Sequence, residues 1–126
     1  MKLVEFPAVE KFSHPDVTAD GSVRASVALD RLETLWFNTG TLCNLACTNC
    51  YIESSPKNDR LAYITAGEVQ QYLTEIAEQD LPVAEIAFTG GEPFMNPEII
   101  SILDASLSAG FKTLVLTNAM RPMMKC

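Results

Sequence analysis

The sequence has few of the features that mark a secreted, membrane or nucleic-acid-binding protein. No hydrophobic run approaches the ~20 residues that a membrane-spanning helix needs, and Glu5 and Pro7 interrupt any signal-peptide pattern. Nine Lys and Arg residues stand against sixteen Asp and Glu, for a net charge of −7. The basic residues are scattered, so the chain lacks the basic stripe that releases counterions from nucleic acid. These absences predict a cytoplasmic protein with no membrane or nucleic-acid partner.

Cysteine and histidine are also scarce, with four cysteines and one histidine in 126 residues. Three of the cysteines nevertheless lie close together, as Cys43, Cys47 and Cys50. Disulfide frameworks belong to small secreted domains, whereas clustered cysteines in a cytosolic chain indicate metal binding or catalysis. With 48% hydrophobic residues the chain can bury an ordinary core without disulfides. We therefore interpret the cysteine group as a metal or catalytic site.

The N-terminal part of the chain differs in pattern from the rest. Prolines interrupt it, and an Asp-Gly turn signal at 20–21 precedes an alternation of apolar and polar residues over 23–29. We predict an N-terminal extension over residues 1–32 that contains a β-strand. Residues 33–126 are then expected to form a single domain.

Short apolar segments in this domain have the character of buried strands. They lie at residues 34–38, 83–88 and 112–116. Helical patterns separate them, and this alternation favours an α/β fold with parallel strands, right-handed crossovers and both faces of the sheet covered.

The helices carry their own start and stop signals. Thr65 and Glu68 have the spacing of a capping box ahead of a helical apolar pattern. Asn96 is the predicted N-cap of the second helix, with Pro97 at its first position and Gly110 beyond its end.

An unusual loop follows each predicted strand. The first, residues 39–64, contains the clustered cysteines; the second is the Gly-Gly-Glu-Pro motif at 90–93, and the third is Thr-Asn-Ala at 117–119. Functional loops of such folds follow the carboxyl ends of the strands. We therefore expect the three loops to share one face of the domain.

The spacing Cys-x-x-x-Cys-x-x-Cys of Cys43, Cys47 and Cys50 is suited to an iron–sulfur cluster. Thiolates are the usual ligands of such clusters, and a cubane normally takes four of them. Three closely spaced cysteines leave one iron without a protein ligand. An open coordination position is what a catalytic metal requires.

Two other interpretations are open. The cysteines could bind structural zinc with Cys126 or His14 as the fourth ligand, although zinc sites usually come as two separated pairs. Cys47 and Cys50 could form a thioredoxin-like redox pair, but such a pair is expected at the start of a helix. A long polar loop separates Cys50 from the first predicted helix.

The cysteine segment at 43–51 resembles the signature of the radical S-adenosylmethionine (SAM) superfamily. Residues 90–93 are similar to that superfamily's second motif, and residues 117–119 to a Thr-Asn-Gly turn common after the third strand. The resemblance spans about residues 35–118, with three motifs in order.

The resemblance implies a partial (β/α) barrel, of which about three βα units are visible, and a truncated chain that alone binds cofactor poorly. It implies a [4Fe–4S] cluster on Cys43, Cys47 and Cys50, with SAM chelating the fourth iron. An enzyme of this kind cleaves SAM reductively to a 5′-deoxyadenosyl radical that abstracts hydrogen from a small-molecule or peptide substrate. It takes its electron from a donor such as a flavodoxin or ferredoxin. The alternative is a non-catalytic iron–sulfur or zinc module.

The resemblance further implies the residues that contact SAM. The carbonyls of Gly90 and Gly91 would accept from the SAM ammonium, whereas Glu92 either contacts the cofactor or braces the loop. Asn49 stands where many members carry an aromatic residue. The predicted SAM contacts are Gly90, Gly91, Glu92, Pro93, Asn49, Tyr51, Thr117 and Asn118.

Overall fold

The computed structural model describes residues 10–126, and the chain divides between Asp30 and Arg31 into two compact units. In the described part of the first unit, a single antiparallel bridge joins Val17 and Val23. The alternating segment 23–29 forms no strand beyond this bridge. Its apolar side chains find no partner strand, since Val27 is 97% exposed and Leu29 is 75% exposed.

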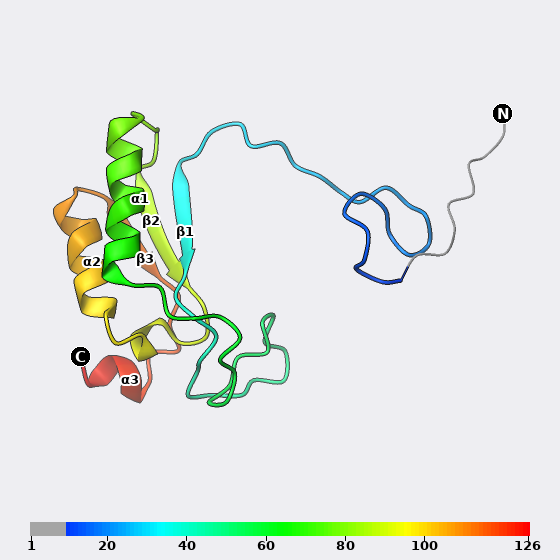
Figure 1. Ribbon diagram of the computed structural model, residues 1–126. Coiled ribbons are helices and arrows are strands. Elements are labelled where there is room, and N and C mark those ends of the chain that lie inside the picture. The colour runs from blue at the N-terminus through cyan, green and yellow to red at the C-terminus, as the bar shows by residue number, and fades with distance from the viewer. Residues whose placement is uncertain (1–9) are drawn as a thin grey trace. The chain divides into compact units, whose positions relative to one another are not determined.

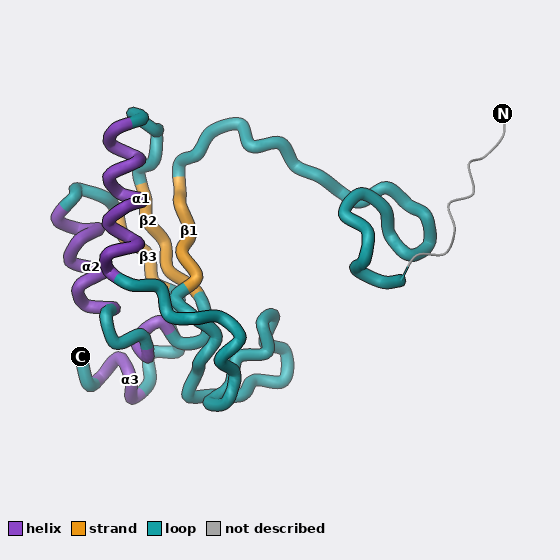
Figure 2. The backbone as a smooth tube through the Cα atoms, viewed as in Figure 1, coloured by secondary structure: helices purple, strands orange, loops and turns teal. Residues whose placement is uncertain are grey.

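The second unit is built on three parallel strands in the order β1–β2–β3 (Figure 1). The strands are β1 (Thr34–Asn38), β2 (Glu85–Thr89) and β3 (Lys112–Val115). The three strand predictions are confirmed, and the arrangement is that of a partial (β/α) barrel. All three strands end at the same edge of the sheet, where the long loops gather (Figure 2).

Helix α1 (Ala66–Glu78) begins at the predicted capping box. Thr65 Oγ1 accepts from the amide of Glu68 at 3.1 Å, and Glu68 Oε2 accepts from the amide of Thr65 at 2.8 Å. Two backbone donors that the first turn leaves unpaired are thereby satisfied. None of the helices in the described part of the chain has the length and hydrophobicity that a membrane crossing requires.

Helix α2 (Ile99–Ser108) begins later than predicted, so the assignment of Asn96 as its N-cap is wrong. A short 3-10 helix, η1 (Pro93–Met95), precedes it, and Glu98 is the N-cap residue. Asn96 Oδ1 accepts from the amide of Glu98 at 2.9 Å in the turn ahead of the helix, and Nδ2 donates to the carbonyls of Thr39 and Ile64 at the two ends of the cysteine loop. A further short helix, α3 (Arg121–Met124), follows β3.

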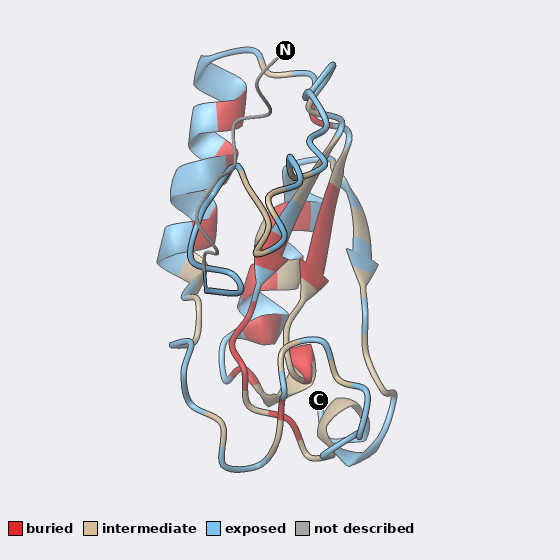
Figure 3. Cartoon of the chain, turned by 90° about the vertical axis from the view of Figure 1, so that its right-hand side faces the viewer, coloured by how far each residue is buried: buried red, intermediate tan, exposed pale blue. Residues whose placement is uncertain are grey.

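Both long helices pack on the same face of the sheet (Figures 1 and 3). The core between them and the strands contains Phe37, Ile86 and Phe88, each 5% exposed or less. Burial of each such side chain contributes about 1.5–3 kcal/mol. Val69, Leu73 and Ile76 of α1 and Ile102 of α2 belong to the same buried cluster.

The expectation that both faces of the sheet are covered is wrong for the described residues. On the face opposite the helices Trp36 is 47% exposed and Leu114 is 39% exposed, and they occupy one row of the register with Ala87. Two successive crossovers of the same hand, moving in one direction along the sheet, place both helices on one side. Covering both faces requires a reversal of the strand order, which this sheet lacks.

The capping box predicts the cost of removing its hydroxyl. Thr65→Ala should lower the free energy of unfolding by about 1 kcal/mol, because the amide of Glu68 loses its acceptor. Urea denaturation measures the change. Thr74→Ala, at an exposed position of the same helix whose hydroxyl donates only to the carbonyl of Gln70, is the control and should have a smaller effect. Equal effects of the two substitutions would contradict the role of the cap.

Candidate functional site

Backbone hydrogen bonds join the cysteine loop to the glycine motif beyond the ends of β1 and β2. The amide of Thr39 donates to the carbonyl of Thr89 at 2.8 Å, and the amide of Gly91 donates to Gly40 at 2.8 Å. The next contact runs from the amide of Glu92 to the carbonyl of Leu42 at 2.9 Å, directly before Cys43. Parallel pairing of the strands is thereby extended into both loops.

Gly90 and Gly91 are required by this close approach. A Cβ atom on Gly91 would lie 2.1 Å from the carbonyl oxygen of Leu42. One on Gly90 would lie 2.6 Å from the carbonyl oxygen of Gly40, and Gly90 has a φ of +143°. The missing side chains therefore make room for the cysteine loop itself, a reason that the sequence alone did not reveal.

Glu92 lies beneath this contact and is only 2% exposed. Its Oε1 accepts from the Thr117 hydroxyl at 2.6 Å and from the amide of Phe94 at 3.2 Å, while Oε2 accepts from the amide of Asn118 at 2.8 Å. Charge-assisted hydrogen bonds of this kind are the strong ones. Glu92 thus braces the loop after β2 against the loop after β3.

Asn118 connects Glu92 to the cysteine loop through its side chain. Its Nδ2 donates to Asn44 Oδ1 at 2.9 Å and to Cys43 Sγ at 3.8 Å. The sulfur of Cys43 also accepts from the amide of Leu45 at 3.4 Å. The side chain that follows the third strand is therefore in contact with the first cysteine.

Cys50 is likewise surrounded by backbone donors. The amide of Ser54 donates to Cys50 Sγ at 3.3 Å. The backbone N–H groups of Ile52 and Ser54 hold the pKa of the Cys50 thiol below its ordinary value. The thiolate, which is the form that binds metal, is favoured by these contacts.

All three cysteines line one cavity of about 420 Å³ at the carboxyl edge of the sheet. Five of the predicted SAM contacts line it as well: Gly90, Gly91, Tyr51, Thr117 and Asn118. Glu92, Pro93 and Asn49 are not part of its wall. Glu92 and Pro93 are buried beneath the loops, whereas Asn49 is exposed.

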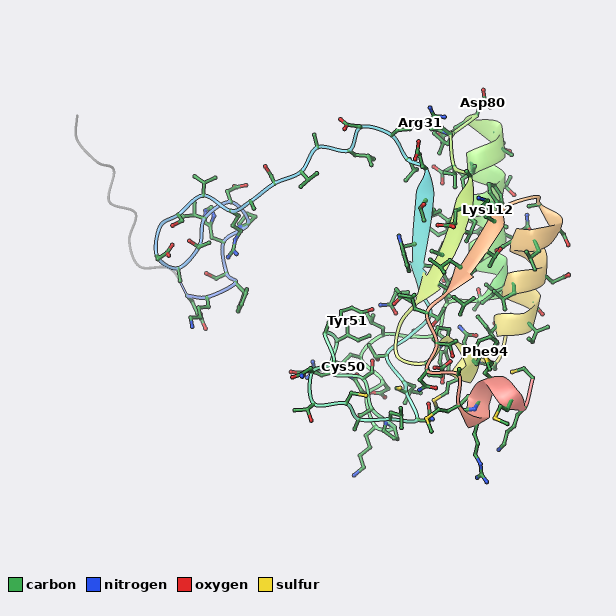
Figure 4. The ribbon with its side chains drawn as sticks, turned by 180° about the vertical axis from the view of Figure 1, so that it is seen from behind. Arg31, Cys50, Tyr51, Asp80, Phe94 and Lys112 are labelled. Atoms are coloured by element: carbon green, nitrogen blue, oxygen red, sulfur yellow. The ribbon has the colours of Figure 1, made fainter. Side chains whose placement is uncertain are left out.

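Sequence reasoning missed five residues of the cavity wall, namely Leu45, Ser54, Thr89, Val115 and Leu116. The positions of Thr89 and Leu116 at the carboxyl ends of strands were the available signal for those two. Thr89 Oγ1 lies 3.0 Å from the hydroxyl of Tyr51. In Figure 4, Cys50 and Tyr51 lie at the same end of the sheet as Phe94, whereas Asp80 and Lys112 mark the opposite end.

The cysteines do not form a site for a single metal ion. Among residues 10–126, no three His, Cys, Asp or Glu side chains converge closely enough to hold one. Cys126 is exposed, with its thiol directed to the carbonyl of Pro122 at 3.3 Å, and does not line the cavity. Separate irons at the corners of a cubane require no such convergence, so the arrangement fits a cluster better than zinc.

The cavity wall also contains a residue whose buried hydroxyl is unpaired. Ser54 is 4% exposed, and its Oγ has no hydrogen-bond partner among the described residues. The donor set, the cavity and this hydroxyl together are compatible with a bound cluster. Cys47 and Cys50 lie in a turn, not at the start of a helix as a thioredoxin-like pair would.

A second hollow, of about 500 Å³, lies beside α1. Tyr63, Tyr72, Glu68 and Glu75 contribute to its wall, and none of the predicted site residues does. This larger hollow is not the candidate site, because the three clustered cysteines and five of the predicted SAM contacts line the smaller cavity instead.

Comparison with known proteins points to the same part of the chain. Residues 37–125 match the family model of the Radical SAM superfamily. Over 76 residues the chain is 36% identical to the antilisterial bacteriocin subtilosin biosynthesis protein AlbA of Bacillus subtilis, covering 60% of this chain and 16% of that protein. It is 30% identical to an S-adenosylmethionine-dependent nucleotide dehydratase of Selenomonas ruminantium, covering 60% and 26%.

The fold is similar to the crystal structure of Streptococcus suis SuiB bound to S-adenosylmethionine. The TM-score is 0.59 at 25% sequence identity, and the match covers 72% of this chain and 20% of SuiB. The chain spans about a quarter or less of the length of these relatives.

The contact between Gly91 and Leu42 predicts a sharp effect of one methyl group. Gly91→Ala should lower the free energy of unfolding by about 1–3 kcal/mol, because the added Cβ forces the two loop backbones apart. Gly67→Ala is the matched control, since its Cβ would meet only Thr65 Oγ1 at 3.9 Å. That change should be neutral or stabilise the chain by up to about 1 kcal/mol. Urea unfolding of both variants measures the two effects. A Gly91→Ala chain whose free energy of unfolding is unchanged would refute the packing argument.

Proposed function

The chain belongs to the radical SAM superfamily, and we propose that it holds a [4Fe–4S] cluster on Cys43, Cys47 and Cys50 and binds SAM at the open iron. The observation that carries the proposal is the single cavity that these cysteines share with the glycine motif and the Thr117–Asn118 turn. The family uses both cofactors, and the structural relative SuiB binds SAM.

When bound, the two cofactors would supply radical chemistry, which begins with reductive cleavage of SAM and leads to hydrogen abstraction from a substrate. The residues of the chain are proposed to bind the two cofactors and to orient them. Gly90 and Gly91 present backbone carbonyls that can accept from the SAM ammonium. Tyr51, Thr117 and Asn118 are proposed to contact the remainder of the cofactor, and Asn49 to offer backbone contacts near the adenine.

Glu92 and Pro93 are proposed to support the loop that binds the cofactor, without contacting the cofactor themselves. The oxygens of Glu92 are engaged by Thr117, Phe94 and Asn118, which supports bracing in preference to direct contact. Pro93 begins η1 and fixes the exit of the motif.

The relatives share the radical generator and differ in what they act on. Their names indicate roles in bacteriocin biosynthesis and nucleotide dehydration. Similarity that covers 26% or less of each of these proteins supports the generator and not one substrate. We propose a small-molecule or peptide substrate and an electron donor such as a flavodoxin or ferredoxin. Residues 33–126 are proposed to form the cofactor-binding part of the core, with residues 1–32 as an extension.

Anaerobic reconstitution of the chain tests the ligand assignment. About four irons and four sulfides per chain are expected, as for a cubane, together with an electron paramagnetic resonance spectrum that changes when SAM is added in large excess, since the chain alone is expected to bind SAM weakly. Each single substitution, Cys43→Ala, Cys47→Ala or Cys50→Ala, should abolish the cluster, because each cysteine is proposed to hold a different iron.

Cys126→Ala is the matched control and should retain full iron content, since that thiol does not line the cavity. Survival of the cluster in the triple Cys43/Cys47/Cys50→Ala chain would falsify the assignment. One zinc without iron, or a cluster whose spectrum ignores SAM, would favour the non-catalytic module.

A further inference from the structure

Ser54 has a buried hydroxyl that forms no hydrogen bond with the residues around it. The residue is 4% exposed, and its hydroxyl is one of two buried side-chain groups without a hydrogen-bond partner in the described part of the chain. A buried hydroxyl without a partner lowers stability, so native structures retain few of them. Each one requires an explanation, and a bound group is one such explanation.

The position of Ser54 is fixed by contacts to two of the cysteines. Its own amide donates to Cys50 Sγ at 3.3 Å, and the amide of Glu53 donates to the carbonyl of Cys50 at 3.2 Å. On its other side, the carbonyl of Ser55 accepts from the amide of Cys43 at 3.1 Å. Ser54 also lines the cavity that all three cysteines share. Ser54 therefore belongs to the wall of the proposed cluster site, and its hydroxyl is buried and unpaired there.

We propose that the Ser54 hydroxyl donates a hydrogen bond to the iron–sulfur cluster, beside the thiolate of Cys50; this inference rests on the proposed function. Sulfides and thiolates of a cluster accept hydrogen bonds and donate none, whereas a serine hydroxyl can donate. Such a bond stabilises the additional negative charge of the reduced cluster and makes its reduction potential more positive. It also helps to retain the metal, as outer hydrogen bonds to metal ligands generally do.

Thr113 is the natural comparison. Its Oγ1 is the other unpaired buried hydroxyl among the described residues, yet it lies on β3, paired in register with Ile86, and does not line the cavity. An unpaired hydroxyl alone thus does not indicate a ligand. The combination with the cysteine cavity distinguishes Ser54.

The test compares Ser54→Ala with Thr113→Val, first without cofactor and then after reconstitution without SAM. Without the cluster, each change should raise the urea midpoint, because each removes an unsatisfied buried group. With the cluster, only Ser54→Ala should lose iron to a chelator about tenfold faster than the unaltered chain. Its midpoint in a one-electron dithionite titration should also shift to a more negative potential, a reaction in which the serine neither gains nor loses a proton.

Several results would overturn the inference. A Ser54→Ala chain that is less stable without cofactor, or that fails to fold, would show that the hydroxyl has a partner within the protein or in bound water. Unchanged iron retention and potential, changes equal to those of Thr113→Val, or an effect that appears only when SAM is present would each exclude a contact with the cluster. Failure of the unaltered chain to take up iron would instead refute the proposed function, and this inference with it.

Discussion

The geometry of the cysteine cavity depends on the hydrogen bonds that the buried carboxylate of Glu92 accepts. Loss of hydration makes a buried carboxylate costly unless donors replace the water. Three donors do so here, and two of them, the Thr117 hydroxyl and the Asn118 amide, come from a different strand connection. With Asn118 fixed in this way, its side chain reaches Cys43. Glu92 therefore shapes the cavity without forming part of its wall.

The cysteine loop itself has little regular structure, so polar side chains must hold it in place. Asn96 is 1% exposed and donates to the carbonyls of Thr39 at 3.2 Å and Ile64 at 2.8 Å, which are the two ends of the loop. Joining the ends of a long loop at one buried amide limits the conformations available to it. The conformational entropy that the loop would lose in the proposed cluster binding is correspondingly smaller.

The features predicted correctly from sequence are those whose cause is local. The pattern Thr65 to Glu68 specifies its own cap, and short apolar runs specify the strands. Asn96 followed by proline has the same local signature, and its Oδ1 does accept from the amide of Glu98, yet the regular helix begins only at Ile99. The reason for Gly91 and the unpaired hydroxyl of Ser54 could not be predicted, because both depend on contacts between segments far apart in the chain. Which faces the helices cover follows from the direction of the crossovers, which no single segment encodes.

Local dipoles, not overall charge, prepare the cavity for metal. A net charge of −7 disfavours thiolates, yet charges beyond a screening length of about 8 Å have little influence at physiological ionic strength. Within that range, the amides of Leu45 and Ser54 and the side chain of Asn118 donate directly to cysteine sulfur. The same donors would stabilise the additional negative charge of a reduced cluster at the proposed site. An acidic chain can therefore offer a thiolate site because its loop backbone supplies the positive ends of dipoles at the sulfurs.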